Sequence, residues 1–246
     1  MVVASYLADI VLPVGFKDLL VSFILVLIPV MLIARQPDLG TAILVGSAGA
    51  FVLFLAGIRW RIMLSLMFLF SLMAPLLWKF ALHDYQRSRI LTMFNPESDP
   101  LGSGYHIIQS KIAIGSGGAY GKGWLNGTQS QLDFIPERST DFIFSVFGEE
   151  FGFFGSVVLI LLYLSIIFRG LYIATRSKDN FGRLVAGAIS LTFFVYLFVN
   201  VGMVSGMLPV VGVPLPLISY GGTSMVTLLT GFGLIMSIRS AKRFMG

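Results

Sequence analysis

Six long apolar runs constrain this chain more than any other feature of its sequence. The hydrocarbon core of a bilayer is about 30 Å thick, and a helix needs roughly 20 apolar residues to cross it. That template predicts membrane spans over residues 19–35, 39–58, 62–81, 142–168, 184–208 and 217–238, with an N-terminal stub at 1–12. We therefore expect an all-α fold, a polytopic transmembrane helix bundle that forms a single membrane domain over residues 1–246.

The composition is typical of a protein whose solvent is lipid. Hydrophobic residues make up 56% of the chain, charged residues only 12%, and the mean hydropathy is +0.88. The net charge of +5 does not indicate nucleic-acid binding, because the basic residues are scattered between the apolar runs. The absence of cysteine excludes disulfides and thiolate chemistry. No signal peptide is predicted at the N-terminus.

One connection differs from the short polar separators between the other spans. Residues 82–141 form a loop of about 60 residues, and loops of that length are usually functional. Most of the polar chemistry outside the spans falls in this loop, which also contains a weak helical pattern from Tyr105 to Ile114. His83 and His106 have no ligand neighbours at helical spacing, so no metal site is predicted.

Lysine and arginine are unevenly distributed between the two ends of the spans. The short loops around 36–38 and 209–216 contain none beyond Arg35 at a helix end. The opposite ends carry Lys17, Arg59, Arg61, Arg169, Arg176, Lys178, Arg183, Arg239, Lys242 and Arg243. Because short cytoplasmic loops carry the excess of basic residues, we expect a cytoplasmic C-terminus and an extracytoplasmic loop at 82–141.

Three carboxylates stand at the start of the fourth run. Asp141 lies where loop meets helix, so it is either an N-terminal carboxylate that interacts with the helix dipole or a base that takes a proton from a hydroxyl. Glu149 and Glu150 are expected two turns deeper in an apolar helix. Intramembrane carboxylates are costly, so these two are either functional or a packing pair.

Two glycine-bearing segments leave further alternatives open. The glycines of 115–118 and 121–123, with Lys122 beside them, could offer backbone N–H groups to a phosphate, although no strand precedes them. The prolines of 209–216, followed by Ser219, Gly221 and Gly222, interrupt the apolar pattern. That segment either lines a cavity or is a plain connection.

Several long strings resemble the SEDS family, which includes FtsW, RodA and SpoVE, and in particular its rod-elongation branch. They are RQPDLGTAILV, HDYQRSRI, NPESDPLGSGYHIIQSKIAIGSGG, GKGW, GTQSQLDFIPERSTDFIFSVFGEE and GMLPVVGVPLPLISYGG. The resemblance extends over essentially the whole chain. It implies a peptidoglycan glycosyltransferase that polymerises lipid II, a polyprenyl-pyrophosphate-linked disaccharide peptide, during cell elongation and rod-shape maintenance.

The resemblance also implies roles for particular residues. The essential acid of the family lies in a Thr-Asp-Phe-Ile-Phe motif, here Thr140 to Phe144, so catalysis is assigned to Asp141. Cations would neutralise the departing pyrophosphate. The expected substrate-binding residues are Lys111, Ser116, Lys122, Glu137, Arg138, Thr140, Ser219, Gly221 and Gly222.

The family resemblance implies a location in the bacterial cytoplasmic membrane. It also implies two partners, the elongation machinery and a class B penicillin-binding protein transpeptidase. No cofactor is assigned, and a divalent cation, Mg²⁺ or Mn²⁺, is left open. The family fold has about four further helices before the position of Met1, so we expect this chain alone to insert but to be poorly stable and inactive. The alternative functions are a flippase for a lipid-linked precursor and a non-catalytic membrane scaffold for the transpeptidase.

Overall fold

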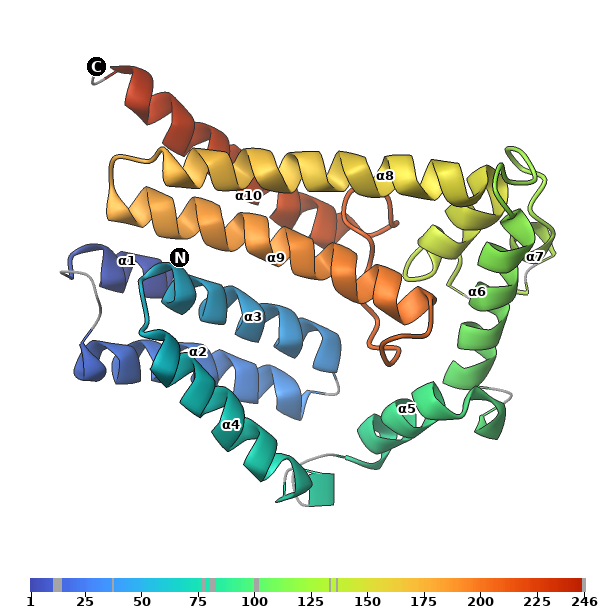
Figure 1. Ribbon diagram of the computed structural model, residues 1–246, viewed down its shortest axis with the longest axis horizontal. Helices are drawn as coiled ribbons and strands as arrows, with labels where there is room; N and C mark the ends of the chain where they lie inside the picture. The colour runs from blue at the N-terminus through green and yellow to red at the C-terminus, as the bar shows by residue number, and fades with distance from the viewer. Residues whose placement is uncertain are drawn as a thin grey trace. The chain divides into compact units, whose positions relative to one another are not determined.

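A computed structural model of the chain contains only helices and loops in the residues it describes, which are 1–10, 15–36, 38–76, 78–79, 83–99, 102–132, 134–135 and 137–244 (Figure 1). The helices are α1 (Val2–Ala8), α2 (Phe16–Arg35), α3 (Leu39–Leu55), α4 (Trp60–Leu76), α5 (Asp84–Phe94), the 3-10 helix η2 (Pro96–Ser98), α6 (Ser103–Gly117), α7 (Thr128–Gln131), α8 (Ile143–Thr175), α9 (Asn180–Val204) and α10 (Gly222–Phe244).

Each predicted span corresponds to one of these helices. Helices α2, α8, α9 and α10 are long and apolar enough to cross a membrane, and α3 is a shorter apolar helix. Helices α3 and α4 have 17 residues each, about 25 Å at 1.5 Å per residue, which is near the lower limit for a span. The predicted all-α, polytopic membrane fold is confirmed. Residues 77 and 80–81 of the predicted span at 62–81, and 11–12 of the stub, lie outside the described residues.

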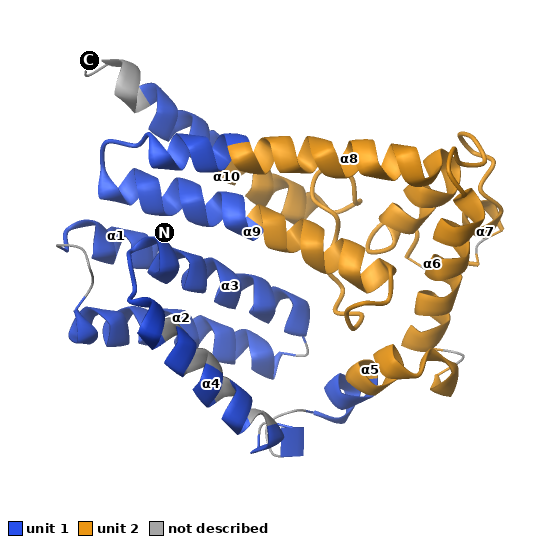
Figure 2. Cartoon of the chain, in the orientation of Figure 1, with its two compact units in different colours: residues 1–88, 169–192, 233–246 blue, residues 89–168, 193–232 orange. Residues whose placement is uncertain are grey.

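The chain forms two compact units, coloured separately in Figure 2. Unit 1 comprises residues 1–88, 169–192 and 233–246, and unit 2 comprises 89–168 and 193–232. The boundaries fall inside α5, α8, α9 and α10. The single membrane domain expected from the sequence stays a prediction.

Unit 1 is built around small residues that let its helices approach one another. Its core includes Ala4 and Leu7 of α1, Ala56 after α3, and Leu184 of α9, all fully buried. A Cβ at Gly49 of α3 would lie 2.4 Å from the Val26 side chain of α2, so α2 and α3 pack as closely as they do because this position is glycine.

The loop expected at 82–141 is largely helical over its described residues. It contains the whole of α5, η2, α6 and α7. The weak pattern from Tyr105 to Ile114 corresponds to α6, which is longer than predicted. Residues 82, 100–101, 133 and 136 of this loop lie outside the described residues.

Helix α8 is broken near its beginning, contrary to the expectation of one continuous span. Gly152 has φ +67° and ψ −163°, which is not helical and is a region of backbone space that only glycine adopts readily. Glu149 and Glu150 precede this break. They lie two turns into the helix, as expected, but the helix is not one continuous span, because its geometry is broken at Gly152 between them and the long apolar part of α8.

Candidate functional site

Asp141 lies in unit 2, in a turn just before α8 whose backbone is tied to distant parts of the chain. The Asn200 Nδ2 of α9 donates to the Asp141 carbonyl at 2.8 Å. The Ser219 Oγ donates to the Thr140 carbonyl at 2.5 Å. Asn200 is fully buried and Ser219 nearly so. Buried hydrogen bonds of this kind fix the position of a backbone segment, so the turn that carries Asp141 is held from two directions.

The Asp141 carboxylate is half-buried, and among the described residues no hydrogen bond or ion pair to it is found. A Cβ on Gly212 would lie 3.5 Å from its Oδ2, so this glycine borders the carboxylate. Burial raises the pKa of Asp141 above its ordinary value, the negative charge of Glu137 raises it further, and the positive charge of Arg89 opposes both. A positioned carboxylate with a raised pKa suits a general base.

Glu137 and Thr140 form the turn that precedes Asp141. The Thr140 Oγ1 donates to the Glu137 carboxylate at 2.7 Å, and the Thr140 N–H donates to the Glu137 carbonyl at 3.1 Å. Glu137 has φ +55°, an uncommon value for a residue with a side chain. Both predicted site residues therefore lie beside Asp141 and shape its turn.

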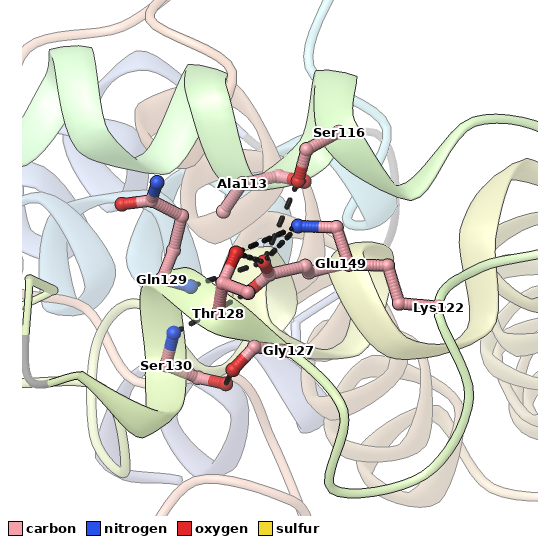
Figure 3. A network of polar contacts seen from close by, with 8 residues as sticks. All are labelled: Ala113, Ser116, Lys122, Gly127, Thr128, Gln129, Ser130 and Glu149. Atoms are coloured by element: carbon pink, nitrogen blue, oxygen red, sulfur yellow. Dashed lines mark hydrogen bonds and ion pairs between the residues drawn. The ribbon is translucent and has the colours of Figure 1, made fainter.

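A second polar cluster surrounds Glu149, whose side chain is fully buried (Figure 3). Its carboxylate accepts from the Lys122 Nζ at 2.7 Å, the Thr128 Oγ1 at 3.2 Å, and the backbone N–H groups of Gln129 at 3.0 Å and Ser130 at 3.3 Å. Lys122 Nζ also donates to Thr128 at 2.8 Å. This arrangement satisfies a buried charge in the way that stable buried ion pairs require.

Of the predicted site residues, Ser116 and Lys122 belong to this Glu149 cluster. The Ser116 Oγ donates to the Ala113 carbonyl at 2.9 Å and lies 3.5 Å from the Glu149 carboxylate. Lys122 is therefore an ion-pair partner of a buried acid, and its expected contact with pyrophosphate stays a prediction.

The glycines at 121–123 are used for packing. The N–H of Lys122 donates to the Glu149 carbonyl and that of Gly123 to the Glu150 carbonyl, both at 3.0 Å. A Cβ at Gly121 would lie 2.1 Å from the Glu150 carbonyl oxygen. The N–H groups of Lys122 and Gly123 are thus bonded to backbone carbonyls and are not free to bind a phosphate.

Lys111 and Arg138 lie at different places in unit 2. Lys111 is exposed on α6, and a Cβ on Gly206 would lie 2.7 Å from its Nζ, so it borders the irregular segment after α9. Arg138 Nη1 donates to the Ser130 carbonyl. Arg138 also lines an open cavity of about 410 Å³, together with Glu150 and aromatic side chains that include Trp124, Phe147 and Phe151.

The irregular segment at 205–221 is a structural partner of the Asp141 turn. The Tyr220 N–H donates to the Ser139 carbonyl at 2.8 Å, in addition to the contact of Ser219 described above. Gly221 and Gly222 lie where α10 begins, and nothing lies within 4 Å of a Cβ built on Gly222. The segment is therefore more than a plain connection, because it holds the residues next to Asp141.

Sequence reasoning missed two residues that surround this turn. The sequence assigned no role in the site to Asn200, and His106 was considered only as a metal ligand. The His106 ring stacks on Phe142 at 5.5 Å between centroids, and burial lowers the pKa of His106 despite the negative charges of Glu137 and Asp99. A polar Asn within an apolar run was the only sequence signal available for either residue.

The described residues contain no group of three or more His, Asp or Glu side chains that could hold a metal ion. This part of the chain therefore offers no protein-only cage for Mg²⁺ or Mn²⁺, and we assign no step to a metal ion.

Comparison with known proteins identifies the family. The profile of the FtsW/RodA/SpoVE family, described as cell cycle protein, matches residues 1–244. The chain belongs to this family. It is 54% identical over 245 residues to the peptidoglycan glycosyltransferase MrdB of Escherichia coli K12. The aligned region covers 100% of this chain and 66% of MrdB. The chain thus spans just under two thirds of the length of that relative.

Solved structures of the family have the same fold. A chain from a peptidoglycan synthase complex that coordinates polymerization and crosslinking superposes with a TM-score of 0.81 at 35% identity, covering 99% of this chain and 67% of that one. An aspartate-to-alanine variant of the rod shape determining protein RodA from Thermus thermophilus superposes with a TM-score of 0.65 at 27% identity, covering 97% and 61%.

Proposed function

We propose that this chain carries the catalytic part of a peptidoglycan glycosyltransferase that polymerises lipid II during cell elongation. The names of its relatives support this activity, since MrdB is a peptidoglycan glycosyltransferase. The observation that carries the proposal is the Asp141 turn. Its backbone is fixed by Asn200 and Ser219, while its half-buried carboxylate has no hydrogen-bond partner among the described residues.

In the proposed reaction Asp141 is the general base. Its carboxylate takes the proton from the 4-hydroxyl of the acceptor sugar as that oxygen forms a bond to the anomeric carbon of the donor. The bond between the anomeric carbon and the pyrophosphate breaks, and the polyprenyl pyrophosphate leaves with the electron pair. Glu137 favours proton uptake by Asp141, because its negative charge raises the pKa of that group.

Lys111 and Arg138 are our candidates to neutralise the departing pyrophosphate. Both are exposed in unit 2, and Arg138 follows directly after Glu137 in the turn that leads to Asp141. Arginine presents a planar set of donors that matches phosphate oxygens. Lys122 remains a weaker candidate, because its ammonium is engaged by the buried carboxylate of Glu149.

The proposed topology is a multi-pass protein of the bacterial cytoplasmic membrane with residues 82–141 outside and the C-terminus in the cytoplasm. The distribution of lysine and arginine supports it. We also propose a class B penicillin-binding protein as partner, on the basis of a neighbouring structure that comes from a complex for polymerization and crosslinking.

The test is a lipid II polymerisation assay with a full-length version of the protein and with the Asp141→Asn variant of that version. A general base contributes about 10²–10⁴-fold, so the variant should lose at least 100-fold. Asp84→Asn is the matched control, because Asp84 is an exposed acid that pairs with Arg87. Transport of lipid II across vesicles without polymerisation would favour the flippase alternative, and inactivity of the full-length version beside active MrdB would favour the scaffold.

A further inference from the structure

Unit 1 contains a cavity of about 260 Å³ near the C-terminal ends of α8 and α10. Three arginines line it, Arg169 and Arg176 from α8 and its end and Arg239 from α10, together with Tyr172 and Ser177. A water molecule occupies about 30 Å³, so the space accepts a group the size of several waters. None of these residues belongs to the site around Asp141.

Tyr172 holds two of the three guanidinium groups in place. The Cζ of Arg169 lies 5.4 Å from the centroid of the Tyr172 ring, and that of Arg176 lies 5.3 Å from it. Both distances are within the range of cation–π attraction. Residues three and four positions apart share one helix face, so a single ring orients two arginines toward the same region.

Two of the arginines, Arg169 and Arg239, give this cavity a positive charge that the helix ends offset only in part. Each helix end contributes about −0.5 charge, so α8 and α10 together offset roughly one of these two positive charges. Asp179 is bonded at the edge of the cavity, because its carboxylate accepts from the Gly182 N–H at 2.7 Å and from the Oγ of Ser177, a lining residue, at 3.0 Å. No carboxylate of the described residues forms an ion pair with Arg169 or Arg239.

We propose that this arginine cavity binds the phosphate group of an anionic phospholipid. Guanidinium groups match phosphate oxygens in geometry, and basic pockets among membrane helices on the cytoplasmic side bind anionic headgroups. Ile173 and Ile238 also line the cavity and give the glycerol and upper acyl carbons an apolar surface. Tyr172 is 50% exposed, so a lipid headgroup can reach the ring and the arginines that it orients.

The experiment measures the binding of phosphatidylglycerol, phosphatidylcholine and inorganic phosphate to the purified 246-residue chain in neutral detergent. Native mass spectrometry or a titration with labelled lipid provides the Kd. The variants are a triple Arg169→Gln, Arg176→Gln, Arg239→Gln chain and a Tyr172→Leu chain that keeps every charge. The matched control is Arg59→Gln, Arg61→Gln, Lys178→Gln, which removes three exposed positive charges that do not line the cavity.

The unmodified chain should bind phosphatidylglycerol at least tenfold more tightly than phosphatidylcholine or inorganic phosphate. The triple arginine variant should lose roughly 100-fold, since each basic residue near anionic lipid contributes about 1 kcal/mol. Tyr172→Leu should lose several-fold, and the control variant less than twofold. Equal losses in the triple variant and the control would overturn the proposal, and inorganic phosphate binding as tightly as phosphatidylglycerol would assign the cavity to a free anion instead. If the triple variant does not fold, unchanged lipid binding by Tyr172→Leu would overturn it as well.

Discussion

The Asn200 side chain donates one hydrogen bond to the backbone carbonyl of Asp141, at 2.8 Å, and a second to the carbonyl of Val213, at 2.7 Å. One buried amide therefore joins the turn of the proposed base to the irregular segment between α9 and α10. Asn200 touches no reacting atom in the proposed mechanism, so it is a positioning residue. Its effect on polymerisation would come through the placement of Asp141.

Replacing Asn200 with Ala should lower polymerisation mainly through kcat. The change leaves two buried carbonyls without their donor, at a cost of about 1–3 kcal/mol in the free energy of unfolding. Asn126→Ala is the control, because Asn126 is exposed. The kcat and KM for lipid II are measured for both variants, together with their thermal unfolding. An Asn200→Ala chain that is destabilised but keeps its kcat would show that the amide only stabilises the fold.

The raised pKa of Asp141 leads to a prediction for activity as a function of pH. A general base must be ionised, so polymerisation should rise as the pH increases through the raised pKa of Asp141 and then level off. Neutralising Glu137 with Gln removes a cause of the raised pKa and should move this rise to lower pH. A rate profile that is the same in the Glu137→Gln chain would contradict the assignment of Asp141 as the titrating base.

The same group gives a prediction for stability. The pKa of Asp141 is higher in the folded than in the unfolded chain, so the folded chain binds more protons between those two values. The free energy of unfolding therefore falls as the pH rises through that window. The Asp141→Asn chain does not lose stability in this way, so its free energy of unfolding should be at least that of the parent at neutral pH. The difference between the two chains should disappear below the ordinary pKa of aspartate. Thermal unfolding followed by intrinsic fluorescence measures this difference.

The sequence predicted the helices of this protein well and its sites only in part. The spans were predictable because lipid requires about 20 apolar residues in a row, a local property of the chain. Asp141 was singled out by its position where loop meets helix, and the family resemblance favoured the base among its two alternative roles. The break at Gly152 was not predicted, since nothing in an apolar run indicates which glycine adopts φ +67°.

The partners of Glu149 could not be predicted for a similar reason. Lys122 is 27 positions away in sequence, and the Gln129 and Ser130 N–H groups reach the carboxylate only because the loop folds back on α8. Asn200 lies 59 positions from Asp141. Such contacts depend on tertiary packing, which hydrophobic periodicity does not describe.

The pair of Lys122 and Glu149 should contribute to stability more than to catalysis. Lys122→Met leaves a fully buried carboxylate without its cation and should cost about 3 kcal/mol in the free energy of unfolding. Adding Glu149→Gln should recover part of this loss, with a coupling energy of about 0.5–3 kcal/mol. The exposed pair of Arg87 and Asp84, at 3.4 Å, is the control and should show less than about 1 kcal/mol. A stable Lys122→Met chain with no polymerisation would instead support contact with pyrophosphate.

The proposed topology can be tested directly, because the chain has no native cysteine. Single cysteines at His106 and Thr128 should react with a membrane-impermeant maleimide in intact cells. Cysteine at Lys178 should react only after the membrane is opened. The distribution of lysine and arginine predicts this pattern, and labelling of position 178 from outside would contradict the proposed orientation.

Gly152 should tolerate no side chain, because its backbone conformation and its surroundings both exclude one. At φ +67° and ψ −163° a residue with a Cβ is strained by about 1–3 kcal/mol. That Cβ would also lie 2.3 Å from the Gly121 nitrogen and 2.8 Å from the Ala119 carbonyl oxygen, so backbone would have to move. Gly115→Ala is the control, since nothing lies within 4 Å of its Cβ and alanine favours a helix by about 1 kcal/mol. In thermal unfolding, the Gly152→Ala chain should be less stable than the parent chain, and the Gly115→Ala chain should be at least as stable as the parent. Equal stability of the two variants would show that this glycine does not fix the break in α8.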